Sequence, residues 1–190
     1  MKRVFIVHRW EGSPRSDWYP WLKRTLEEKG FQVMVPKMPD TRRPKIRSWV
    51  DALKKQVRVV DQDTYFIGHS IGCQTIIRYL GSQSKKCGGC IFVGGWFALT
   101  SQATPTLEYE RLAAPWLLTP IDFSRAKKNI GGAIAILSTN DPYVPILNKE
   151  VFVKTLGVKV KMVNDYGHFT KEEGITSLPF IIKEIKRIAG

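Results

Sequence analysis

TYFIGHSIGCQTIIRYL, residues 64–80, joins a short apolar run to a glycine-rich turn and a longer apolar segment. We expect a strand over Thr64–Ile67 and a helix over Gly72–Leu80. Between them lies Gly68-His69-Ser70-Ile71-Gly72, which has the spacing G-x-S-x-G. A sharp turn there puts the hydroxyl of Ser70 at its tip, and the flanking glycines avoid collisions with neighbouring backbone. Ser70 is therefore a candidate nucleophile, with an ordinary structural turn as the alternative.

Short apolar runs alternate with amphipathic segments on both sides of this turn. Further strands are predicted over Val4–Val7, Phe31–Val35, Cys90–Val93, Ala133–Leu137 and Val158–Val163. Further helices are predicted over Trp18–Lys29, Trp49–Val60, Asp122–Asn129 and Ser177–Ile188, with Val144–Lys154 a loop that turns into a helix. This alternation predicts an α/β fold in one domain, residues 1–190, with a mainly parallel sheet of about six strands and helices on both faces. The less regular segment Ala98–Pro120 predicts a minimal lid or pocket wall.

The chain is strongly basic, with 30 Lys and Arg against 17 Asp and Glu and a formal net charge of +13. Its densest basic stretch, Lys37–Arg47, also contains prolines and turn residues, and the remaining positive charge is spread along the sequence. No basic block has the length of a nucleic-acid-binding tail. We therefore expect a solvated basic surface, and keep weak attraction of anionic substrates or polymers as the alternative.

The three cysteines are Cys73, Cys87 and Cys90, and their odd number argues against a disulfide-built secreted domain. The Cys87/Cys90 spacing could suit a metal or redox pair. The sequence has no second C-x-x-C and no histidine pair to complete a zinc site, so we interpret both as ordinary thiols. The apolar run Val4–Val7 is too short for a signal peptide or a membrane span. A cytoplasmic location with no metal and no organic cofactor is expected.

Two polar residues follow late predicted strands. Asp141 comes shortly after Ala133–Leu137, and His168 comes after the last strand. With Ser70 they give the chain order Ser, Asp, His, in which the carboxylate orients the histidine and the histidine moves the serine proton. Alone, Asp141 would suit an ordinary Asp-Pro turn. Asp165, three residues before His168, is a rival partner for the histidine.

Acyl transfer also requires two N–H groups aimed at the developing oxyanion. One donor should be the backbone N–H of Ile71, which follows the candidate nucleophile. The other should come from the loop after the first strand, with Trp10 the first choice and Arg9 the second. Three further side chains are expected to border the substrate: His8, Trp96 and Trp116.

These pieces together resemble the small α/β-hydrolases of the retinoblastoma-binding protein 9 and YdeN group of serine hydrolases. The matching segments span most of the chain: residues 4–8 and 18–22, Met38-Pro39, residues 49–53 and 68–72, Asp141-Pro142-Tyr143-Val144-Pro145, and Gly167-His168-Phe169. The resemblance implies a compact α/β-hydrolase core with little or no cap, and Ser70, Asp141 and His168 as the catalytic triad. One departure is Arg9, which follows His8 where many hydrolases have glycine, so the second oxyanion donor stays open.

The sequence thus favours a serine hydrolase that cleaves a small carboxylic ester through a Ser-His-Asp triad and an acyl-enzyme. Thioesters or amides are the alternative substrates for the same machinery. The expected partner is a small-molecule ester rather than nucleic acid or a membrane. The alternative function is a non-catalytic module on a hydrolase scaffold that binds a protein or a polyanion, because fold alone does not specify function.

Overall fold

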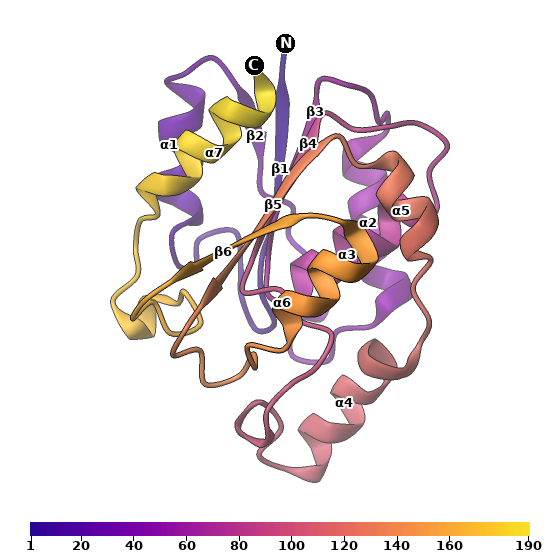
Figure 1. The fold of residues 1–190 in the computed structure, drawn as a ribbon, viewed down its shortest axis with the longest axis vertical. Coiled ribbons are helices and arrows are strands. Elements are labelled where there is room, and N and C mark those ends of the chain that lie inside the picture. The colour runs from indigo at the N-terminus through magenta and orange to yellow at the C-terminus, as the bar shows by residue number, and fades with distance from the viewer.

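Six strands form one parallel sheet in the computed structural model, which describes residues 1–190 (Figure 1). The strands are β1 (Arg3–Val7), β2 (Gln32–Met34), β3 (Thr64–His69), β4 (Gly89–Val93), β5 (Gly132–Ser138) and β6 (Lys159–Val163). Their order is β2-β1-β3-β4-β5-β6, and every neighbouring pair is parallel. The predicted α/β sheet is confirmed. The order reverses beside β1 and β3, and in such sheets the crevice at the carboxyl ends of the strands there receives the ligand.

Seven helices complete the fold, with the sheet sandwiched between two layers of them. They are α1 (Tyr19–Glu27), α2 (Ile46–Val57), α3 (Ile71–Gly81), α4 (Leu107–Leu118), α5 (Phe123–Asn129), α6 (Asn148–Val151) and α7 (Pro179–Ala189). Figure 1 shows α1 and α7 on one face of the sheet and α2, α3 and α5 on the other. Both termini lie at one end of the molecule, and α4 projects at the opposite end. None of these helices has the length and apolar character needed to cross a bilayer.

Alternation of side chains along the strands feeds two separate hydrophobic cores. In β1, Val4 and Ile6 belong to the core under α1 and α7, whereas Phe5 and Val7 belong to the core under α2 and α3. Successive strand side chains point to opposite faces, so a strand covered on both sides is apolar at every position. All of β3 is buried for this reason.

The segment Ala98–Pro120 is more regular than its sequence suggests, because it contains the 12-residue helix α4. Pro115 lies inside α4 near its carboxyl end, where it has no N–H to donate to the Arg111 carbonyl oxygen, and the helix nevertheless continues to Leu118. The helix is held to the body by Trp116, whose Nε1 donates to the Pro44 carbonyl oxygen at 3.0 Å. The lid is therefore a small helix on an otherwise uncapped domain.

The turn between β3 and α3 is a single residue. Ser70 has φ 55° and ψ −123°, a conformation that side-chain-bearing residues rarely adopt. A Cβ on Gly68 would lie 2.8 Å from the Cys73 Cα, and a Cβ on Gly72 would lie 2.2 Å from the Val7 carbonyl oxygen. Both glycines are required because α3 packs this closely against its own strand and against β1.

Replacing Gly72 with alanine is expected to force α3 away from β1, because the added methyl group meets rigid backbone. We expect a loss of about 3 kcal/mol in the free energy of unfolding, measured by urea denaturation. Gly81→Ala, at the other end of α3, is the matched control, since its Cβ would come no closer than 3.3 Å to any atom outside the helix. Equal stability losses in the two variants would contradict this account of the turn.

Candidate active site

Ser70 lies at the carboxyl end of β3, and its side chain opens into a cavity of about 390 Å³. The Ser70 residue is 5% exposed, so the hydroxyl reaches this cavity but little bulk solvent. Its backbone N–H donates to the Val93 carbonyl oxygen at 2.9 Å, which ties the turn to β4. Its Oγ accepts a hydrogen bond from Nε1 of Trp96 at 3.2 Å.

His168 lines the same cavity and is paired with Asp141. The His168 Nδ1 lies 2.8 Å from Asp141 Oδ2, and the Asp141 side chain is 1% exposed. This contact places the proton on Nδ1, so Nε2 keeps a lone pair that can accept a proton. No hydrogen bond joins His168 to Ser70 in this structure, and such bonds often tighten only when substrate is bound.

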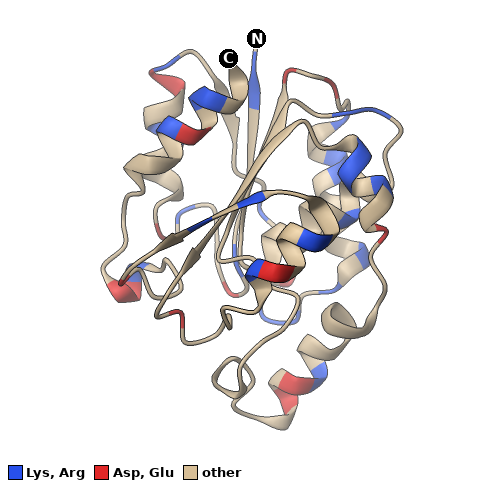
Figure 2. Ribbon diagram, viewed as in Figure 1, with Lys and Arg blue, Asp and Glu red and all other residues tan.

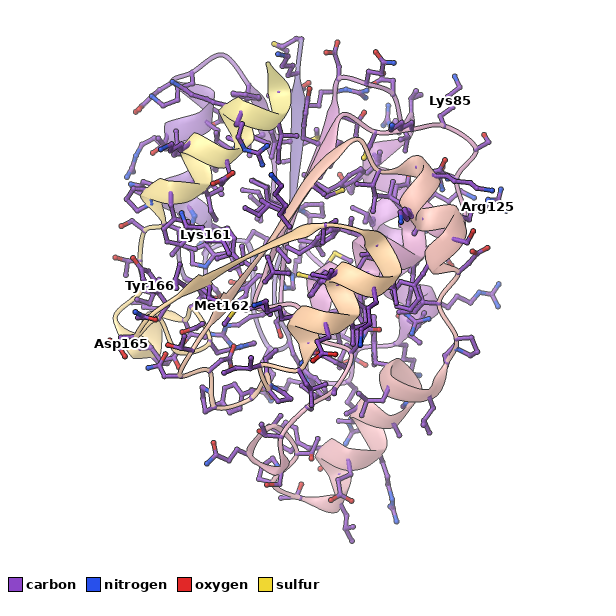
Figure 3. The ribbon with its side chains drawn as sticks, in the orientation of Figure 1. Lys85, Arg125, Lys161, Met162, Asp165 and Tyr166 are labelled. Atoms are coloured by element: carbon purple, nitrogen blue, oxygen red, sulfur yellow. The ribbon has the colours of Figure 1, made fainter.

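Asp141 also shapes its own turn. Its Oδ1 accepts the backbone N–H groups of Tyr143 at 2.9 Å and Val144 at 3.0 Å, while Oδ2 faces the histidine. Asp141 is therefore both a turn former, through Oδ1, and the partner of His168, through Oδ2. The rival Asp165 is exposed, and Figure 3 places it at the outer margin of the molecule beyond the end of β6.

The backbone of the His168 loop is fixed by Glu173, a residue that the sequence analysis did not single out. The Glu173 carboxylate accepts the His168 N–H at 2.8 and 2.7 Å and also bonds the N–H and hydroxyl of Thr170. Thr170 and Glu173 form a capping box, and the S/T-x-x-E spacing was the signal available in the sequence. Gly167 has φ 48°, and a Cβ there would lie 2.0 Å from Glu173 Oε1, so a larger residue would be strained and would displace this carboxylate.

Behind the cavity, a chain of hydrogen bonds joins the loop after β1, the start of α1, the end of β3 and the loop after β6. The Arg9 backbone N–H lies 3.1 Å from the Tyr19 hydroxyl, which lies 2.6 Å from His69 Nδ1. The His69 Nε2 in turn lies 2.8 Å from the His168 carbonyl oxygen. These partners make His69 a neutral imidazole that donates through Nε2 and accepts through Nδ1. Burial, with a smaller contribution from His168, lowers the pKa of His69 to about 3.

The same chain distinguishes the two candidates for the second oxyanion donor. The N–H of Arg9 is already engaged by Tyr19, and the Arg9 guanidinium pairs with buried Asp17 at 2.8 Å. The backbone N–H of Trp10 donates to no group of the protein, and Trp10 lines the cavity. Ile71 is the first residue of α3, so the helix supplies no acceptor for its N–H.

Of the three side chains expected beside the substrate, Trp96 is on the cavity wall and His8 and Trp116 are not. His8 is fully buried: its Nε2 accepts from the Met38 N–H at 3.2 Å, and its ring packs edge-on against Trp49. Trp116 also packs edge-on against Trp49. The remaining aromatic or apolar wall comes from the lid and its neighbours: Leu99, Pro105, Tyr109 and Tyr143.

Two of the three cysteines lie apart from this site. Cys87 and Cys90 are buried free thiols at the amino-terminal end of β4, with their Sγ atoms 3.8 Å apart, whereas Ser70 follows the carboxyl end of β3. Cys73 is buried within α3. No group of three or more His, Cys, Asp or Glu side chains is arranged to hold a metal ion.

A parallel sheet of this order, with a serine at a strained strand-to-helix turn and a His-Asp pair from later loops, defines an α/β-hydrolase. The sequence matches the Serine hydrolase family over residues 4–187, and the chain belongs to that family. It is therefore a hydrolase.

Two relatives and one solved structure show how far the similarity extends. YdeN of Bacillus subtilis (strain 168) is 29% identical over 182 residues, which cover 95% of this chain and 92% of YdeN. Serine hydrolase RBBP9 of Rattus norvegicus is 29% identical over 157 residues, covering 82% of this chain and 80% of RBBP9. The crystal structure of the B. subtilis ydeN gene product matches with a TM-score of 0.90 and 26% identity, covering 99% and 98% of the two chains.

The neutral state of His69 predicts a pH-dependent stability. Its folded pKa of about 3 lies below the ordinary value of 6.5, so below pH 6.5 the unfolded chain binds a proton that the folded protein does not. Stability is then fully present above pH 6.5 and is lost as pH falls, by up to about 1.4 kcal/mol per pH unit. In His69→Gln, the free energy of unfolding, measured with urea at several pH values between 6 and 4, should fall less steeply with decreasing pH than in wild type. An unchanged pH dependence would contradict the neutral state of His69.

Proposed function

We propose that this protein hydrolyses small carboxylic esters, with Ser70 as nucleophile, His168 as general base and acid, and Asp141 as the residue that orients His168. The observation that carries the proposal is the 2.8 Å His168–Asp141 pair on the cavity into which the Ser70 hydroxyl opens. That pair leaves the one unprotonated ring nitrogen on the side of the histidine away from Asp141.

In the acylation step, Ser70 Oγ attacks the ester carbonyl carbon while its proton passes to His168 Nε2. The imidazolium that forms is stabilised by Asp141. The backbone N–H groups of Ile71 and Trp10 are the donors for the carbonyl oxygen, which becomes negative. Collapse of this intermediate breaks the bond to the alcohol, which takes the proton from His168 and leaves an acyl group on Ser70.

In the deacylation step, water attacks the acyl carbon and gives a proton to His168. The bond between that carbon and Ser70 Oγ breaks, the proton returns to Oγ, and the carboxylic acid is released. Every proton transfer involves Ser70, His168, water or substrate, so the proposed mechanism uses no metal and no organic cofactor.

The cavity supports a small substrate. Its volume of about 390 Å³ lies near the lower end of the range of roughly 300–1,000 Å³ that is common for ligand pockets. Trp10, Trp96 and Tyr143 give it an aromatic wall. The basic side chains are distributed over many elements of the fold (Figure 2), so they do not favour a binding module over an enzyme.

A fluorophosphonate probe is expected to label the native protein on Ser70, because such probes react with activated serines. Ser70→Ala should abolish labelling, as read by gel fluorescence and by mass of the modified peptide. Ser138→Ala provides a matched control, since Ser138 is also a buried serine, at the end of β5, but donates to Asn140 outside the proposed mechanism. Labelling that persisted in Ser70→Ala would refute the nucleophile.

The two aspartates near His168 give a second test. Asp141→Asn should lower kcat/KM for p-nitrophenyl acetate by roughly 10³-fold or more, because an amide no longer holds the ring in the productive tautomer. Asp165→Asn removes a charge from an exposed residue three positions from the histidine and should stay within about twofold of wild type. A larger loss in Asp165→Asn than in Asp141→Asn would reverse the assignment.

A further inference from the structure

The loop after β4 delivers an indole ring to the proposed nucleophile. Gly94 has φ 52°, and a Cβ on Gly95 would lie 2.8 Å from the Phe152 ring and 2.9 Å from the Cys73 side chain. The two glycines therefore let the chain turn tightly over α3. Trp96 follows directly, and its side chain points back toward Ser70 rather than outward.

Trp96 is held firmly in this position. It is 2% exposed, and its carbonyl oxygen accepts from the Gln74 side chain at 3.0 Å within the buried face of α3. Gln74 Oε1 is in turn bonded by the Arg78 guanidinium. The indole N–H thus has a fixed direction, and the one acceptor it meets is Ser70 Oγ at 3.2 Å.

This bond occupies a lone pair of Oγ and leaves the hydroxyl proton free for His168. It is also the only hydrogen bond that the Ser70 hydroxyl makes in the structure. Because the indole is buried, the interaction is poorly screened by water, and it would strengthen as negative charge builds on the oxygen.

We propose that the indole N–H of Trp96 is a further catalytic donor that stabilises negative charge on Ser70 Oγ, chiefly when this oxygen is expelled during deacylation. The inference rests on the proposed function, because it concerns the same acyl-enzyme. It assigns Trp96 to a different atom from the oxyanion donors: Ile71 and Trp10 serve the substrate carbonyl oxygen, and Trp96 serves the serine oxygen.

The negative charge reaches Ser70 Oγ when one particular bond breaks. In the second tetrahedral intermediate, the carbon–Oγ bond breaks and its electron pair passes to Oγ, while the oxyanion re-forms the carbonyl. Oγ then takes the proton that His168 Nε2 had received from water. The Trp96 proton stays on the indole nitrogen throughout and only bonds more strongly as the pair arrives.

Pre-steady-state hydrolysis of p-nitrophenyl acetate by the full chain separates the two steps. Trp96→Phe keeps an aromatic ring and removes the N–H, and we expect the deacylation constant to fall about tenfold. The acylation constant should change less, because this activated ester loses a phenolate that needs little help. The burst of nitrophenol should therefore become more prominent in the variant. A general loosening of the site would instead lower both constants.

Trp49→Phe is the matched control, since Trp49 is also buried and its Nε1 donates to the Pro39 carbonyl oxygen, away from the cavity and from the lid helix. If Trp96→Phe fails to fold, the sulfur isostere benzothienylalanine at position 96 removes the N–H and keeps the ring shape. Deacylation within threefold of wild type in a folded variant would overturn the role of Trp96 while leaving the proposed function intact. Absence of any acyl group on Ser70 in the wild type would overturn the proposed function itself.

Discussion

The close approach of α3 to β1 is the constraint on which the rest of the site depends. A single added carbon at Gly72 would lie 2.2 Å from the Val7 carbonyl oxygen, so the helix begins as near to the strand as backbone allows. The chain must then pass from β3 to α3 through one residue, and Ser70 takes the positive φ that this requires. Its N–H is satisfied by Val93 on β4. The position of the serine is therefore set by the backbones of three adjacent strands.

The buried hydrogen-bond chain also restrains the site, because all of its bonds donate in one direction. Arg9 donates to Tyr19, Tyr19 donates to His69, and His69 donates to the carbonyl oxygen of His168. Protonation of His69 would take away the acceptor for the Tyr19 hydroxyl. Burial lowers the pKa of His69 and so keeps this acceptor available. The loop after β1, the end of β3 and the loop after β6 are thereby joined without placing a positive charge beside His168. Networks of this kind are stabilising only when every member is satisfied, as it is here.

The sequence was sufficient for the parts of this structure that depend on local pattern. Buried parallel strands are continuously apolar, so the inner strands and the turn around Ser70 could be predicted. The edge strands β2 and β6 are only partly buried, and they could be predicted from short runs rich in β-branched residues. Helix α4 could not, because Pro115 and the exposed Leu107 and Leu118 obscure its periodicity. Within the site, residue types and chain order pointed to Ser70, His168 and Trp96, which line the cavity, but also to His8 and Trp116, which do not. The choice between the N–H groups of Arg9 and Trp10 depends on a bond across ten residues, which no spacing rule contains.

The two turns that carry Asp141 and His168 are each restrained by their own local hydrogen bonds. Asp141 caps its own turn through Oδ1, and the His168 loop is closed by Glu173, five residues away. Each turn is thus held by neighbours in sequence as well as by the contact between the two. The ring and backbone of the histidine are restrained by different carboxylates, one governing tautomer and charge and the other position. A single 2.8 Å contact joins the two turns, and because both are already restrained, little conformational entropy is lost in holding His168 beside the Ser70 cavity.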